Sequence, residues 1–425
     1  MVRAPAPEPR VTEPFRLSRL IPNVYAPSLL HAAGYGMLAP ALPLYAQQLD
    51  VPLALIGLLV AVQGLGAMAI DVPAGLVASR FGGRRAMAIG LVASAAGALA
   101  LAVSASPAQL FLAIPLVGAG TAAWATARLS YVADAAPIDR RGRALALTGG
   151  SSRIGMTLGP VLGGFLGEAF GLQAAFLGHA GITTLALAGV LWRRAHDHTL
   201  HAPTHGPSYG PAGPHEDRAH ARVLRTVVEH RRSLATAGSV ALSLAMLRSA
   251  RRVLVPLWGA WIGLDLAEIG LVIGLASAVD MTLFYPVGVV MDRWGRKWTI
   301  VPCLVTLATS LALIPLTASF APFLAVSLLG GFGNGLGSGA IMTMGADLAP
   351  RERRGEFLGV WRLIGDSGGV FAPAIVGAVA QAVTLGAAFL VSAGVGVAGA
   401  LLLGLWVPEG LTRSERRSDA EPPGG

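Results

Sequence analysis

The chain has 425 residues, of which 54% are hydrophobic and only 13% are charged, and its formal net charge is +9. Soluble domains usually carry about 25% charged residues, so this composition excludes an ordinary water-soluble protein. Apolar segments long enough to cross a bilayer core, roughly 20 residues each, recur along the whole chain. The single cysteine, Cys303, excludes a disulfide framework within one chain.

Twelve apolar spans follow one another along the chain, and they predict an all-α integral membrane protein. They cover residues 22–47, 53–78, 86–105, 108–135, 144–168, 173–192, 233–261, 267–290, 298–317, 321–347, 357–381 and 386–406. We expect two six-helix halves, 21–192 and 233–407, flanked by tails at 1–20 and 408–425 and separated by a Pro-, Gly- and His-rich linker at 193–232.

The second half repeats the first at a constant offset of 213 positions. The stretch that begins at Gly75, with the letters GLVASRFGGRR, reappears at Gly288 as GVVMDRWGRK. The same offset places Pro43 on Pro256 and Arg140 on Arg353. One offset without gaps across such distant points indicates that the chain contains two copies of one module.

The connections between spans alternate in charge. Those near 80–85, 139–143, 193–232, 293–297 and 351–354 carry arginine or lysine, whereas the alternate connections carry none. Basic loops of membrane proteins face the cytoplasm. We therefore expect a multi-pass protein of the cell membrane with both termini in the cytoplasm.

Six helices, a basic linker and six repeated helices are typical of secondary transporters built from parallel repeats. The stretch from Gly75 to Arg85 is similar to the cytoplasmic loop motif G-x-L-x-D-R-x-G-R-R of the major facilitator superfamily. The chain resembles that family from end to end, apart from the tails and the linker, and in particular its 12-helix drug/proton antiporter group. The motif positions are Gly75, Ser79, Arg80, Gly82 and Arg84 in the first copy, and Gly288, Asp292, Arg293 and Gly295 in the second.

This resemblance implies a charged gate at the cytoplasmic side, with Arg80 paired to Asp134 and Arg293 paired to Asp347. Ser79 stands where the motif has an aspartate, so we expect the first gate to be the weaker one. A purely topogenic basic loop is the alternative interpretation.

Residues 155–164 match the antiporter motif G-x-x-x-G-P-x-x-G-G of the same family, and the resemblance implies export. The matching positions are Gly155, Gly159, Pro160, Gly163 and Gly164. Glycines four residues apart share one helix face, and a proline removes a backbone donor. The motif therefore predicts either a smooth surface on which helices slide or tight static packing. The arginine that such antiporters carry early in helix 4 is replaced by Ile114.

Ionisable residues inside membrane spans usually mark function or paired structure. The fold of the family implies that helices 1, 4, 7 and 10 line the substrate cavity. The candidate substrate contacts are His31, Gln63, Arg128, Arg248 and Asn334. We expect Arg251 and Arg252 to lie near the outer interface and to snorkel towards water.

Helices 2, 5, 8 and 11 of the family form the two seams between the halves. Charges of opposite sign and similar depth predict an Arg153–Asp280 pair across one seam. Across the other seam, Asp71 is expected to face Arg362 or Asp366. A buried carboxylate that loses its cationic partner takes up a proton more readily, which is the basis of proton coupling. Static pairs that hold the halves together are the alternative.

These observations predict proton-coupled efflux of a small organic compound by alternating access. An uptake symporter for a sugar or other nutrient and a non-transporting membrane sensor are the alternatives. We expect no enzyme activity, because the protease-like letters Gly365-Asp-Ser-Gly-Gly369 fall inside an apolar span. The expected partners are the lipid bilayer, a small-molecule substrate and protons. We expect a monomer that binds no nucleic acid, no cofactor and no resident metal, and we interpret the histidines of the linker as part of a solvated segment.

Overall fold

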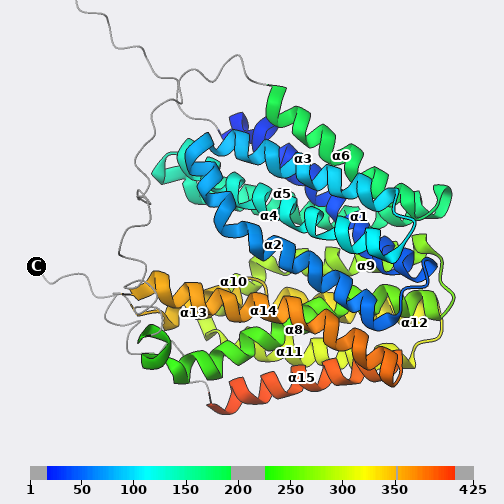
Figure 1. Ribbon diagram of the computed structural model, residues 1–425. Coiled ribbons are helices and arrows are strands. Elements are labelled where there is room, and N and C mark those ends of the chain that lie inside the picture. Colours follow the sequence, from blue (N-terminus) through cyan, green and yellow to red (C-terminus); the bar gives the residue numbers. More distant parts are fainter. Residues whose placement is uncertain (1–16, 193–224, 351–352, 407–425) are drawn as a thin grey trace, which may run out of the picture.

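The computed structural model describes residues 17–192, 225–350 and 353–406, and these residues form helices joined by short turns (Figure 1). Most of the two tails and of the linker, including the linker histidines between 196 and 220, lies outside the described residues. The first half contains η1 (Leu17–Leu20), η2 (Ile21–Tyr25), α1 (Ala26–Gln48), α2 (Leu53–Phe81), α3 (Gly83–Ala102), α4 (Pro107–Ala135), α5 (Ile138–Phe170) and α6 (Gln173–Trp192). The second contains α8 (Arg231–Trp261), α9 (Leu266–Thr282), α10 (Phe284–Trp294), α11 (Lys297–Leu313), η3 (Ile314–Leu316), α12 (Phe320–Leu336), α13 (Ala340–Leu348), α14 (Arg354–Ala382) and α15 (Leu385–Trp406).

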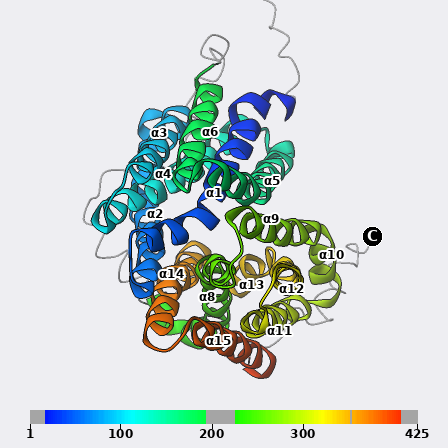
Figure 2. The ribbon, with the colours of Figure 1, turned by 90° about the vertical axis from the view of Figure 1, so that its right-hand side faces the viewer.

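The described helices form two bundles, α1–α6 and α8–α15, that lie against each other along α2, α5, α9 and α14 (Figures 1 and 2). Each of the twelve predicted apolar spans corresponds to one helix or to one interrupted helix. Eight helices in the described part are long and apolar enough to cross a membrane, and α9 with α10 makes a ninth. The all-α membrane fold expected from the sequence is confirmed.

Two helices of the second half are interrupted, which the sequence pattern did not indicate. A bend of 41° separates α9 from α10 at Leu283. Between α12 and α13 the chain makes a turn that ends at Gly339, whose φ of 75° favours glycine. A Cβ on Gly335 would meet Leu283 and the backbone of Asp280, whereas a Cβ on Gly339 would meet nothing within 4 Å.

Glycine allows the two bundles to approach closely at one end of the molecule. A Cβ on Gly57 of α2 would collide with the backbone of Pro373 in α14, and a Cβ on Gly270 of α9 would collide with the backbone of Pro160 in α5. The offset of 213 maps Gly57 onto Gly270 and Pro160 onto Pro373. The repeat therefore produces the same helix contact twice, once in each seam.

The opposite end, which carries the basic connections, is packed less closely. A Cβ on Gly75, Gly149, Gly359 or Gly365 would meet nothing within 4 Å, although all four lie in helices of the seams. Figure 1 shows the two bundles diverging towards this end. The halves are therefore in tight contact at the end of the molecule that carries the uncharged connections. They diverge towards the end that carries the basic connections.

Candidate functional site: a cavity between the halves

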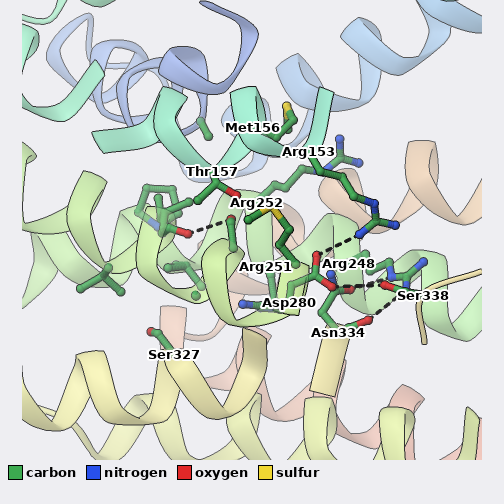
Figure 3. Close-up of a pocket in the computed structure, with 18 of the residues that line it drawn as sticks. Arg153, Met156, Thr157, Arg248, Arg251, Arg252, Asp280, Ser327, Asn334 and Ser338 are labelled. Carbon is green, nitrogen blue, oxygen red and sulfur yellow. Dashed lines mark hydrogen bonds and ion pairs between the residues drawn. The ribbon is translucent and has the colours of Figure 1, made fainter. Parts of the chain in front are cut away.

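A cavity of about 580 Å³ lies between the two halves. Its wall comes mainly from α5, α8, α9 and α12, together with both helix interruptions of the second half. The charged or amide side chains on the wall are Arg153, Arg248, Arg251, Arg252, Asp280 and Asn334 (Figure 3). Four arginines against one aspartate give this wall a net charge of +3.

One ion pair crosses the seam at the cavity. Arg153 of α5 extends towards Asp280 of α9, with Nη1 3.9 Å from Oδ2 (Figure 3). Ser338 donates a hydrogen bond to the other carboxylate oxygen of Asp280 at 3.3 Å, and the Arg153 guanidinium lies over the ring of Phe284 at 4.5 Å. The geometry predicted for this pair from depth and charge is present, and its role in coupling is a proposal.

The second seam holds a group of three charges. Arg362 Nη2 of α14 lies 3.5 Å from Asp71 Oδ2 of α2, and its Nε lies 3.3 Å from Asp366 Oδ2 one turn further along α14. Thr126 of α4 donates to Asp71 at 3.5 Å. Of the two partners considered for Asp71, the structure places Arg362 in contact.

Three arginines of α8 share one face, because positions 248, 251 and 252 are three and four residues apart. Arg248 donates through Nε to Asn334 Oδ1 at 2.7 Å and through Nη2 to the Asn334 carbonyl at 3.3 Å. Arg251 donates to the Gly330 carbonyl at 3.0 Å, and Arg252 to Ser249 Oγ at 2.9 Å. The prediction that Arg251 and Arg252 snorkel at the outer interface is wrong, because their helical spacing turns both towards the cavity.

Of the five predicted substrate contacts, only Arg248 and Asn334 line this cavity. Gln63 is buried, and its backbone packs against Gly118 of α4. Arg128 donates to Ser152 at 2.8 Å and lies over the Trp124 ring. His31, Gln63 and Arg128 therefore do not line this cavity, whereas Arg153 of the same half does.

His31 belongs to a buried polar chain inside the first half. Its Nδ1 lies 3.3 Å from Thr183 Oγ1, which is 3.3 Å from His179 Nδ1, and His179 Nε2 is 3.1 Å from Ser94 Oγ. The chain links α1, α6 and α3. Sequence reasoning missed His179, whose signal was a histidine in the middle of an apolar span.

The charge cluster of the second gate differs from the family pattern in one residue. The contact to Asp347 comes from Arg296, whose Nε lies 2.9 Å from Oδ2, whereas the resemblance assigned this contact to Arg293. Arg296 also approaches Asp292 at 3.8 Å. The chain turns at Gly295, with φ of 105°, and this turn directs the following arginine back towards α13.

In the described part of the first gate, no pair between Arg80 and Asp134 corresponds to the contact between Arg296 and Asp347. Within the described residues Arg80 lies over the ring of Phe81 at 5.6 Å and is not paired with Asp134. Arg84 instead donates to the carbonyls of Val190 at 2.7 Å and Leu191 at 3.0 Å, where it satisfies the end of α6. The side chain of Ser79 lies outside the described part. The Arg80–Asp134 expectation is therefore not met in this conformation.

The glycine motif of α5 packs mainly inside its own half. A Cβ on Gly155 or Gly159 would meet the backbone of α1, and one on Gly163 would meet Met37 of α1. Gly164 faces the other half, against Leu266 at the start of α9. Three of the four glycines thus serve static packing, and only the end that contains Pro160 and Gly164 lies in the seam.

Another ionic cluster lies outside the membrane spans, where the end of the linker meets α14. Glu229 accepts from Arg225 at 2.7 Å and from Arg353 at 2.6 Å, so it joins residues 225–229 to the beginning of α14. The hydrogen bond from Arg225 and the charge of Arg353 lower the pKa of Glu229.

Two helix bundles with a charged cavity between them are typical of secondary membrane transporters built from repeats. The family model of the Major Facilitator Superfamily matches residues 28–249 and 237–424, and the chain belongs to this family.

Relatives agree with this assignment. An uncharacterized MFS-type transporter of Bacillus subtilis (strain 168), YdeG, is 28% identical over 353 residues, which cover 78% of this chain and 80% of YdeG. The inner membrane transport protein YajR of Escherichia coli (strain K12) is 31% identical over 164 residues, so the match spans about a third of its length (36%) and 38% of this chain. A crystal structure of a mutant of the nucleoside transporter NupG superposes with a TM-score of 0.73 at 14% identity, over 92% of this chain and 100% of that chain, which shows the shared fold.

Proposed function

We propose that the chain exports a small organic compound in exchange for protons, by alternating access of the cavity between its halves. The observation that carries this proposal is the Arg153–Asp280 pair, which is both part of the cavity wall and a link across the seam. A group in this position responds to substrate and to the relative position of the halves. Proton uptake by Asp280 would follow separation from Arg153, since burial disfavours an unpaired carboxylate.

The direction of transport and the orientation of the chain belong to the proposal. The basic connections lie at the end where the halves diverge, and basic loops favour the cytoplasm. The described conformation is then the inward-facing one, with both termini in the cytoplasm of a monomer. The similarity of residues 155–164 to the exporter motif supports efflux.

A second candidate is uptake of an anionic nutrient together with protons. The observation that favours it is the arginine excess of the cavity. When a proton neutralises Asp280, Arg153 is released and the wall becomes more positive, so protonation and anion binding strengthen each other. Groups that bind together tend to be carried together, which is the thermodynamic pattern of symport.

Inverted membrane vesicles with an acidic lumen distinguish these candidates. Export in exchange for protons accumulates the compound in the lumen and dissipates the pH gradient, which a pH-sensitive dye reports. Symport drives the compound out of the lumen with the protons. Movement that is identical with and without the gradient, or no movement of any compound in a broad panel, contradicts the proposed coupling; the latter result favours a sensor.

Asp280→Asn in the same vesicles is the informative variant. It preserves the shape of the side chain and removes the proton-binding group, so we expect gradient-driven transport to be lost. Exchange of labelled compound across vesicles without a pH gradient shows whether the variant still binds and moves substrate.

A further inference from the structure

The three α8 arginines on the cavity wall are held by neutral oxygen atoms alone. Arg248 uses two N–H groups on Asn334, Arg251 uses one on Gly330, and Arg252 uses one on Ser249. In the described ranges of the chain, none of the three lies within 4.0 Å of a carboxylate. A guanidinium has five N–H donors, so each retains several for a ligand.

Arg251 has the clearest unsatisfied hydrogen-bond donor of the three. Its Nε is buried and has no hydrogen-bond partner among the described residues, while its Nη1 is fixed to α12. Charged residues in membrane spans are costly, and they occur mainly where they face the interior of a bundle or a water-filled cavity. The only acidic group on this wall, Asp280, is already paired with Arg153.

The remainder of the wall is largely apolar. Met156, Val255, Val272, Ile273 and Ala276 contribute to it from α5, α8 and α9. A volume of about 580 Å³ lies within the range of pockets that hold drug-sized ligands. The site therefore combines a cluster of planar cations with a hydrophobic surface next to it.

We infer that this cavity selects organic anions: compounds with an apolar body and one or more carboxylate, sulfonate or phosphate groups. Arg248, Arg251 and Arg252 bind the anionic group, since guanidinium matches planar and tetrahedral oxyanions bidentately. The apolar body packs against the surface formed by α5 and α9. This inference rests on the proposed transport function and specifies its substrate class, and it holds for either direction of transport.

The competing interpretation is that these arginines are structural brackets. Arg248 and Arg251 connect α8 to α12, and a bracket needs no ligand. The two interpretations differ in a measurable way: a bracket affects thermal stability and binding of every ligand alike, whereas an anion site discriminates between ligands of one shape by charge.

Calorimetric titration of the full chain in nanodiscs tests this with four naphthalene probes: 1-naphthalenesulfonate, 1-naphthoate, 1-naphthalenemethanol and 1-naphthylmethylammonium. We expect both anions to bind at least about tenfold more tightly than the alcohol, and the ammonium to bind weakest. Sulfonate binding should weaken as salt is raised, since salt screens charge. Equal affinity for the sulfonate and the alcohol overturns the inference.

Arg248→Gln, Arg251→Gln and Arg252→Gln should each weaken sulfonate binding about tenfold and leave binding of the alcohol unchanged. Arg232→Gln, at an exposed position of the same helix, is the matched control and should have no effect on either probe. Arg251→Lys tests the site if Arg251→Gln unfolds, because lysine keeps the charge but loses the fork. An equal loss for sulfonate and alcohol in these variants supports the bracket and refutes the anion site.

The outcome for transport is separate. If the vesicles move a neutral or cationic compound under a proton gradient while the probes show no anion preference, the substrate class is wrong and the transport function stands. If the sulfonate binds as expected but no anion of the panel is transported, the anion site stands and the proposed function fails.

Discussion

Replacing Asp280 with asparagine isolates the charge of the seam pair from its shape. Asparagine is isosteric with aspartate, so the hydrogen bond from Ser338 can be retained while the attraction to Arg153 is lost. The variant also raises the net charge of the cavity wall from +3 to +4. Two results follow: Arg153 becomes available to an anion, and the proton-binding group disappears.

The distance gives the size of the effect. Unit charges 3.9 Å apart attract by about 1 kcal/mol at the dielectric constant of water and by about 4 kcal/mol at an effective value of about 20. The side chains of Arg153 and Asp280 are 35% and 20% exposed, which favours a value near the middle, about 2 kcal/mol. We therefore expect 1-naphthalenesulfonate to bind up to about 30-fold more tightly to Asp280→Asn than to the parent chain.

The pH dependence provides the decisive measurement. In the parent chain, sulfonate affinity that increases as pH falls favours the second candidate, symport, whereas affinity that decreases favours exchange for protons. The Asp280→Asn variant should show a flat profile in either case. The sulfonate stays anionic throughout, so its own titration does not contribute. Full pH-driven transport by Asp280→Asn, or a pH profile that matches the parent chain, refutes this account of coupling.

Three further predictions concern packing and ionic contacts. Gly57→Ala places a methyl group against the backbone of the other half and should lower the free energy of unfolding by about 1–3 kcal/mol. Gly75→Ala in the same helix meets open space and should be neutral or stabilising in thermal melts. Equal melting temperatures of the two variants contradict the seam contact. Asp347→Asn should destabilise the protein by about 1–2 kcal/mol, and Asp292→Asn by less than about 0.5 kcal/mol. The reason is that Asp292 is 81% exposed and lies further from Arg296, which both carboxylates contact. The reverse order contradicts the assignment of Asp347 as the main partner of Arg296. Glu229 has a lowered pKa, so its contribution to stability is present above pH 4.5 and is lost as pH falls through that lowered value; the melting-temperature difference between the parent chain and Glu229→Gln should therefore vanish in acid, and a difference that persists contradicts the ionic contact.

The sequence allowed the architecture and the partners across the seams to be predicted, because both depend on position along a helix. Hydropathy gives the spans, and a rise of about 1.5 Å per residue gives depth, which brought Arg153 opposite Asp280 and Asp71 opposite Arg362. Neither pairing depends on the exact rotation of the helices, as long as the charged side chains remain in the seam.

The face of the helix on which a side chain lies was harder to predict. Arg251 was placed by depth alone, although its spacing from Arg248 already put both on one face. Asp347 contacts Arg296 and not the expected Arg293 because of the turn at Gly295, which a motif alignment does not describe. The turn before Gly339 was missed because the span as a whole is apolar, although the residues before this glycine are rich in glycine and include Asn334 and Ser338. Mean hydropathy does not register an interruption of the backbone.

The interruptions at Leu283 and Gly339 give the second half a mechanical property that the first half lacks. Both lie beside Asp280, and the short segments beyond them, α10 and α13, are joined to each other through Arg296 and its two carboxylate partners. In the first half α2 and α4 continue without interruption past the same level. A change at the cavity could therefore move α10 and α13 together, relative to the uninterrupted helices of the first half. Bending at these two joints would add to the relative movement of the halves that separates Arg153 from Asp280.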